Sequence, residues 1–148
     1  MRGLIFLALF FFGWLLALPA FAIPPVVPLV GAGVLKEPAP GTAILMPYLI
    51  APVVVDEKLV AYAYVSSAVV AASPSAAVDV RNRTPFIQDC YVRDVNALPV
   101  GKADDPATVD VIGLATRMLA DARKVVGTSE VVGIRIIHVQ MSVIRPAS

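Results

Sequence analysis

The sequence predicts an α+β fold, an antiparallel sheet with a kinked long helix and a second amphipathic helix packed on one face. The sheet is predicted because β-branched segments lie at residues 43–55 and 59–72 and a third closes the chain at residues 131–144. The helices are predicted because apolar residues recur every three or four positions across the intervening region. The expected order is strand, strand, helix, helix, strand.

The first two strands are expected to form a β-hairpin. Pro47 and Pro52 confine the first strand to a sheet edge or to a bulge, since proline has no N–H to donate. Residues 56–58, Asp-Glu-Lys, are a polar turn, and residues 59–72 form the second strand. Aromatic and small aliphatic residues of this strand fall on opposite faces: Tyr62 and Tyr64 on one, Ala61, Ala63 and Val65 on the other.

A long helix is expected after Ser73, a favourable N-cap, and Pro74, which suits the first helical position. One face carries residues at spacings of three and four: Ala77, Val80, Thr84, Ile87, Tyr91 and Val95. Pro85 cannot donate a hydrogen bond to the carbonyl of Arg81, yet the stripe continues on both sides. A kink is therefore expected at Pro85 rather than a helix end.

The second helix is expected to start at Asp105-Pro106, which repeats the same start signal, and to end at Gly127. Its broad apolar face consists of Val111, Ala115, Met118, Leu119, Ala122, Val125 and Val126. Charged residues are expected on the opposite face: Asp110, Arg117, Asp121 and Lys124. Arg117 and Asp121 are four positions apart, which favours an ion pair along the helix.

The last strand, residues 131–144, presents two sets of apolar residues. Val132, Ile134 and Ile136 form one face, and Ile137, Val139, Met141 and Val143 form the other. The side expected to be buried switches near Ile137, which indicates a β-bulge or a strong twist there.

Residues 1–22 are typical of an export signal or an N-terminal membrane anchor. Arg2 precedes a long apolar run, and Ala20 and Ala22 stand at the spacing that a signal peptidase reads. Cleavage would follow Ala22, whereas an uncleaved anchor would cross the inner membrane through residues 4–22. In both cases the remaining chain is expected in the periplasm or on the periplasmic face of the inner membrane.

Residues 23–42, rich in proline and glycine, are expected to form a semi-extended spacer before one small domain at residues 43–148. The formal net charge is +1, so no nucleic-acid partner is expected. The single cysteine, Cys90, excludes an internal disulfide.

Several short stretches resemble the flagellar basal-body-associated FliL family. Residues 47–50, Pro-Tyr-Leu-Ile, lead into the first strand as in that family. Residues 84–89, Thr-Pro-Phe-Ile-Gln-Asp, are similar to its proline-containing stretch within the long helix, with Gln88 where the family prefers arginine. The amphipathic helix before Val125-Val126-Gly127 and the closing strand complete a resemblance that covers most of residues 43–145.

The resemblance implies a FliL-like periplasmic α+β domain behind a membrane segment. It also implies a non-enzymatic accessory protein of the bacterial envelope, a homo-oligomer assembled around a larger complex such as the flagellar stator. The alternative, from another class, is a soluble periplasmic binding or chaperone-like module that is released after signal cleavage.

Resemblance to a ring-forming family further implies a subunit interface at Pro85, Phe86 and Ile87. Phe86 projects off the apolar stripe toward the charged side of the helix, next to the expected kink. The alternative is that the kink rotates the helix and Phe86 repacks against the core.

No catalytic, metal or cofactor site is expected. A hydrolase would need Cys90, His138 and an acid such as Asp89 or Asp94 to meet, and nothing in their spacing requires it. One cysteine and one histidine do not make a metal ligand set. A small hydrolase using this pair is the remaining, distant option.

Overall fold

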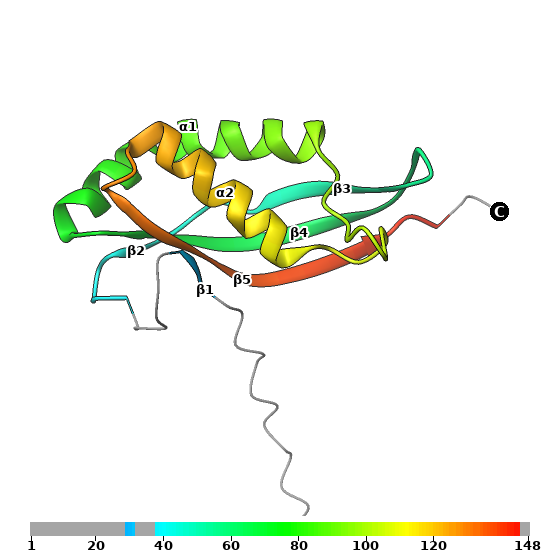
Figure 1. The fold of residues 1–148 in the computed structure, drawn as a ribbon, viewed down its shortest axis with the longest axis horizontal. Coiled ribbons are helices and arrows are strands. Elements are labelled where there is room, and N and C mark those ends of the chain that lie inside the picture. The colour runs from blue at the N-terminus through cyan, green and yellow to red at the C-terminus, as the bar shows by residue number, and fades with distance from the viewer. Residues whose placement is uncertain (1–28, 32–37, 146–148) are drawn as a thin grey trace, which may run out of the picture.

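The computed structural model describes residues 29–31 and 38–145, which form an α+β fold in two layers (Figure 1). One layer is an antiparallel sheet, and the other consists of helices α1 (Pro74–Ala97) and α2 (Val111–Val126) on one face of that sheet. The predicted fold class is confirmed. The predicted leader, residues 1–22, lies outside the described residues, and none of the helices described here has the length and apolar character to span a membrane.

The sheet is organised around one long strand. β4 (Lys58–Ala71) pairs with β5 (Val131–Val143) on one side and, on the other, with β2 (Ala43–Leu45) and then β3 (Leu49–Val55). β1 (Leu29–Gly31) pairs with β5 and completes the order β1-β5-β4-β2, with β3 also against β4. Helix α1 covers mainly β3 and β4, whereas α2 lies over β5 and β1.

β1 corrects the predicted extent of the spacer. Residues 29–31 fall within the proline- and glycine-rich segment, yet they form a strand beside Gly133–Arg135. These three residues, Leu-Val-Gly, contain no proline. Pairing with β5 therefore allows a strand here, although the composition of the spacer around them does not favour one. The sheet therefore recruits chain before residue 43, and the other spacer residues up to 37 lie outside the described residues.

Two prolines shape the opposite edge. Pro47 falls in the gap between β2 and β3, so the segment predicted as one strand is divided in two. Pro52 lies within β3, opposite Tyr62, and β3 is an edge strand among the described strands, as predicted. The predicted hairpin with β4 is confirmed, and its turn places Asp56 and Glu57 at φ 48° and 61°, the conformation that two-residue hairpin turns favour.

Alternation along β4 separates a side that faces the helices from an open side. Three small residues are almost fully buried beneath the helix layer: Ala61, Ala63 and Val65. Tyr62 and Tyr64 point the other way and are 38% and 36% exposed. The predicted division of this strand is therefore confirmed.

Helix α1 starts and bends where predicted. The Ser73 hydroxyl oxygen accepts a hydrogen bond from the N–H of Ala76 at 3.1 Å, and Pro74 is the first helical residue. Ala76 is buried without having been predicted, and Thr84 of the predicted stripe is only half-buried; the other buried residues follow the stripe: Ala77, Val80, Ile87, Tyr91 and Val95. Figure 1 shows α1 changing direction part-way along, as expected from the hydrogen bond that Pro85 cannot make.

Helix α2 starts later than predicted. Its N-cap is Asp110, whose Oδ1 accepts a hydrogen bond from the N–H of Gly113 at 3.0 Å. The predicted cap, Asp105, instead stabilises a turn by accepting from the N–H of Ala107 at 3.3 Å and from the Thr108 hydroxyl. Asp110, predicted on the outer charged face, is therefore part of the helix start.

Tertiary contacts explain why α2 starts later in the sequence than predicted. Gly101 and Val109 form an isolated β-bridge, and Val100 and Val109 are 1% and 5% exposed. The loop between the helices is thus held against the core, and helical geometry begins only after Val109. The predicted end at Gly127 is confirmed, with φ 132° at that residue.

The bulge predicted near Ile137 is confirmed. Ile136 pairs with Ser67 and His138 with Ser66, so Ile137 is an extra residue between them. Residues an odd number of positions apart normally face opposite sides of a strand. Because of the extra residue, Ile136 and Val139 both face the helices.

A second irregularity corrects the predicted face of the first half of β5. Gly133 pairs with Val70 and Val131 with Ala71, which leaves Val132 unpaired between them. Val132 is 41% exposed, whereas Val131 is fully buried. The assignment of Val132 to the buried face was therefore wrong, because strict alternation does not hold across a bulge.

The helix cap provides a test of this local structure. Replacing Asp110 with Ala should lower the free energy of unfolding by about 1 kcal/mol, because the N–H of Gly113 loses its acceptor. Asp104→Ala, in the exposed part of the same loop, is the matched control and should change stability by less than about 0.5 kcal/mol. Urea denaturation measures both, and equal losses would contradict Asp110 as the cap.

Candidate interaction site

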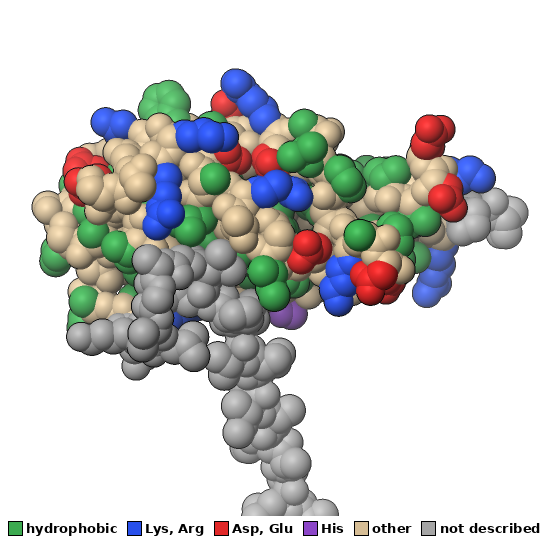
Figure 2. All heavy atoms as spheres, viewed as in Figure 1, with side chains coloured by type: hydrophobic (Ala, Val, Ile, Leu, Met, Phe, Trp, Pro, Cys, Tyr) green, Lys and Arg blue, Asp and Glu red, His purple; other side chains and the backbone are tan. Residues whose placement is uncertain are grey.

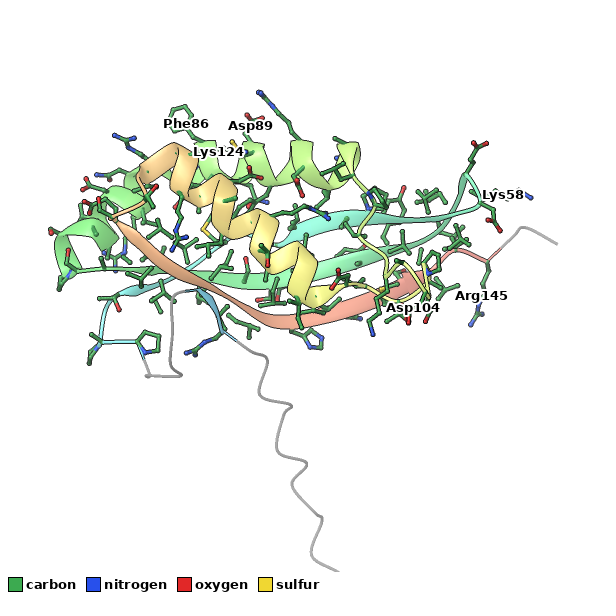
Figure 3. The ribbon with its side chains drawn as sticks, in the orientation of Figure 1. Lys58, Phe86, Asp89, Asp104, Lys124 and Arg145 are labelled. Atoms are coloured by element: carbon green, nitrogen blue, oxygen red, sulfur yellow. The ribbon has the colours of Figure 1, made fainter. Side chains whose placement is uncertain are left out.

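Phe86 is the most exposed large apolar residue of α1, with 66% of its surface exposed. Figure 3 shows its ring pointing away from the sheet, on the outer side of the helix layer. The idea that the kink turns Phe86 into the core is therefore wrong. Of the three residues predicted at a subunit interface, Pro85 and Phe86 lie at the surface, but Ile87 is fully buried in the core.

Charged side chains accompany Phe86 along the outer side of α1. Arg83, one turn before it, donates from Nη1 to the carbonyl oxygen of Val125 at 2.6 Å and so links α1 to α2. Asp89, one turn after it, pairs with Arg93 at 2.7 Å. Figure 2 shows Lys and Arg side chains gathered over the helix layer, with acidic groups between them. An exposed aromatic ring among polar groups on a rigid helix has the character of an interaction hot spot.

A second apolar surface lies on the open side of the sheet. Ile50 pairs with Tyr64 and Pro52 with Tyr62, and cross-strand partners share a face. Ile50, Tyr62 and Tyr64 are 50%, 38% and 36% exposed. The strands β2, β3, β4 and β5 contain no Asp or Glu, so the acidic residues between positions 38 and 145 lie in the helices and connecting segments.

A polar seam joins the two helices. Arg117 Nε lies 2.8 Å from Asp94 Oδ2 on α1, and Asp121 accepts from Lys124 Nζ at 2.9 Å. The predicted pair between Arg117 and Asp121 is therefore wrong, because Arg117 reaches across to α1 instead of along α2. Asp121 is 8% exposed and so belongs to the helix interface rather than to the outer face.

Tyr91 lies beneath this seam. It is fully buried, and its hydroxyl has no hydrogen-bond partner among the described residues. Burial raises the pKa of Tyr91, and the nearby Asp121 carboxylate and the Cys90 sulfur raise it further. The hydrogen bond to Asp121 raises the pKa of Lys124, with the charge of Asp121 reinforcing it. Both shifts favour the protonated forms, so Tyr91 stays neutral and Lys124 stays charged at neutral pH.

The residues of the hydrolase option lie in different layers. Cys90 is partly buried on α1, whereas His138 is exposed on β5 and pairs with Ser66 on the open side. The structure does not bring this pair together as nucleophile and base. Within residues 29–31 and 38–145, no cluster of three His, Cys, Asp or Glu could hold a metal ion.

The seam between the helices was not predicted from the sequence. Asp94 lies three positions after Tyr91 and therefore at the margin of the apolar stripe, which is the one signal that pointed to it. Its partner Arg117 is 23 positions away and on another helix. Local spacing carries no information about such a pair.

No known protein family and no curated protein matches this sequence. Functional interpretation therefore depends on the two apolar surfaces, around Phe86 and on the open side of the sheet.

Tyr91 provides a test of the buried interface. Tyr91→Phe should raise the free energy of unfolding at pH 7 by about 1 kcal/mol, because it removes a buried hydroxyl without a partner. The raised pKa means that the tyrosine ionises in the unfolded chain from about pH 10 while the folded protein keeps it neutral. Wild-type stability should therefore fall as the pH rises above about 10, by about 1.4 kcal/mol per pH unit from this group.

Tyr91→Phe should lack this part of the alkaline loss. Urea denaturation at pH 7 and at pH 11 measures both effects, and Tyr48→Phe, at a residue 70% exposed, is the control. A Tyr91→Phe variant that loses as much stability as the wild type between the two pH values would contradict the assignment.

Proposed function

We propose that this chain is a non-enzymatic accessory protein of the bacterial envelope that assembles with copies of itself around a larger complex. The flagellar stator is the first candidate for that complex. The exposed Phe86 is the observation that carries the proposal. A phenylalanine with 66% of its surface exposed on a well-packed helix has no role in the core and gives a partner a large apolar anchor.

The FliL-like assignment has support from the order of elements. The resemblance implies a hairpin, a long proline-containing helix, an amphipathic helix and a closing strand, and the observed elements follow this order. Pro85 and Phe86, two exposed residues of the stretch that resembles the family, are neighbours on α1. The anchor that would position the domain is the leader, residues 4–22.

One observation favours the alternative of a soluble periplasmic binding or chaperone-like module. The open side of the sheet presents Ile50, Tyr62 and Tyr64 to solvent, and a shallow apolar sheet face suits extended apolar segments of other proteins. Such a module would act after release from the membrane, whereas an accessory subunit of the stator would act while anchored.

A charge at the aromatic anchor tests the first proposal. Phe86→Glu should weaken self-association by about 2 kcal/mol, roughly 30-fold in the dissociation constant, because the carboxylate must be desolvated at the interface. Stability should change by less than about 0.5 kcal/mol, since the side chain is exposed. Sedimentation velocity of the purified full chain in detergent measures the association.

The matched control is Ile112→Glu on α2, where the wild-type side chain is 62% exposed. It adds the same charge to a similarly exposed apolar position and should leave association unchanged. Equal effects of the two variants, or no effect of Phe86→Glu, would remove Phe86 from the interface.

The state of the leader separates the two functions. An anchored subunit should appear at full length in the inner-membrane fraction, whereas a released module should begin at Ile23 and appear in the soluble periplasm. Cell fractionation and intact mass of a C-terminally tagged chain measure this. Ala20→Lys, which disrupts the cleavage signal, should increase the precursor if cleavage occurs and change nothing if the leader is an anchor.

A further inference from the structure

Among the described strands, only β1 pairs with the outer edge of β5, and more than half of that strand has no partner there. β1 occupies only Gly133–Arg135. Among the described strands, none pairs with the outer side of residues 137–143. An uncovered edge strand presents unpaired N–H and C=O groups that another strand can use.

The direction of the backbone N–H and C=O groups in this part of β5 follows from the pairing of β5 with β4. The N–H of Ile144 donates to the carbonyl oxygen of Val60 at 2.9 Å, so it points toward β4. Backbone groups alternate along an antiparallel strand, so those of Val139, Met141 and Val143 point outward, and those of Gln140 point inward.

This edge lacks the features that normally protect an edge strand. Residues 137–143 contain no proline and no Asp, Glu, Lys or Arg, whereas the opposite edge strand β3 carries Pro52. Ile137, Met141 and Val143 are 43%, 37% and 72% exposed. The edge therefore combines available backbone groups with exposed apolar side chains.

We propose that a second copy of this chain pairs antiparallel with this edge, about a twofold axis at Gln140. The segment is self-complementary in that register. Val139 then lies opposite Met141, and Ile137 opposite Val143, so apolar residues meet apolar residues on the helix side.

On the open side, His138 lies opposite Ser142 and each Gln140 opposite its symmetry mate. The sheet continues across both copies with the helices of both on the same side. A closed twofold dimer of this kind uses one patch on each copy and leaves no further copy of the patch to extend the assembly.

The second copy is favoured over the chain's own residues before β1. In the antiparallel direction set by β1, those residues would come next along β5, but they include Pro24, Pro25 and Pro28, which have no N–H to donate. The segment of the second copy has a donor at every position. The proposal does not rest on the flagellar assignment or on Phe86, which lies on the outer side of the helix layer.

Disulfide cross-linking tests the register. In a Cys90→Ala background, Gln140→Cys places two cysteines opposite each other in a non-hydrogen-bonded pair, with Cα atoms about 4.5 Å apart, which a disulfide spans. His138→Cys, on the same strand and face, is the matched control, because its two copies would lie about 14 Å apart along the strand.

Under mild oxidation of the full-length protein, Gln140→Cys should form about tenfold more covalent dimer than His138→Cys at equal times. Phe86→Glu should leave this cross-link unchanged, which separates the dimer from the proposed function. Equal cross-linking of the two cysteine variants, or none, would overturn the proposal.

A charge at the edge tests the interface without cysteines. Met141→Lys should raise the dimer dissociation constant at least about tenfold, because each lysine would face the apolar Val139 of the other copy and the two charges would lie diagonally across the axis. Tyr62→Lys, at a position 38% exposed on the central strand, adds the same charge away from the edge and should not alter it.

Sedimentation velocity measures both variants, and thermal unfolding monitors their folding. Amide hydrogen exchange measures separately whether the backbone N–H groups of the β5 edge are covered. Slow exchange at Met141 and Val143 in a protein that remains monomeric would show that the chain covers its own edge, and would overturn the proposal.

Discussion

The long central strand β4 is the constraint on which the rest of the structure depends. It pairs with β5 on one side and with both β2 and β3 on the other, so each of these elements takes its place from this one strand. Its alternation of small aliphatic residues and tyrosines then decides which side the helices cover. Ala61, Ala63 and Val65 give α1 and the loop between the helices an apolar surface on which to pack.

Covering the sheet on one side leaves two surfaces that a single copy does not use. The open side retains Ile50, Tyr62 and Tyr64, and beyond β1 none of the described strands pairs with the outer edge of β5. Proline protects one edge through Pro52, but the sequence places no comparable residue on the other. This asymmetry and the exposed ring of Phe86 on the outer side of α1 are the two observations from which the proposals of self-association are argued.

The helix layer shows why the partners of charged residues are difficult to predict from the sequence. Spacing suggests that Arg117 should pair with Asp121 along α2, but the crossing of the helices brings Asp94 within 2.8 Å of Arg117. The side chains of Arg117 and Asp94 are both partly buried, so water and salt screen their attraction less than that of an exposed pair. Asp121 therefore pairs with Lys124, and the Tyr91 hydroxyl is buried with no hydrogen-bond partner in the described part of the chain.

The sequence by itself determined the type and order of the main elements, the hairpin, the start and bend of α1, the end of α2 and the bulge at Ile137. These features follow from local chemistry: the period of apolar residues, the missing N–H of proline, the freedom of glycine and the caps available to a helix. Only the tertiary structure decided that Asp110 rather than Asp105 caps α2, that Phe86 stays in solvent while Ile87 enters the core, and that residues 29–31 join the sheet. Each of these depends on packing and pairing in the folded chain, which outweigh local preferences of comparable strength.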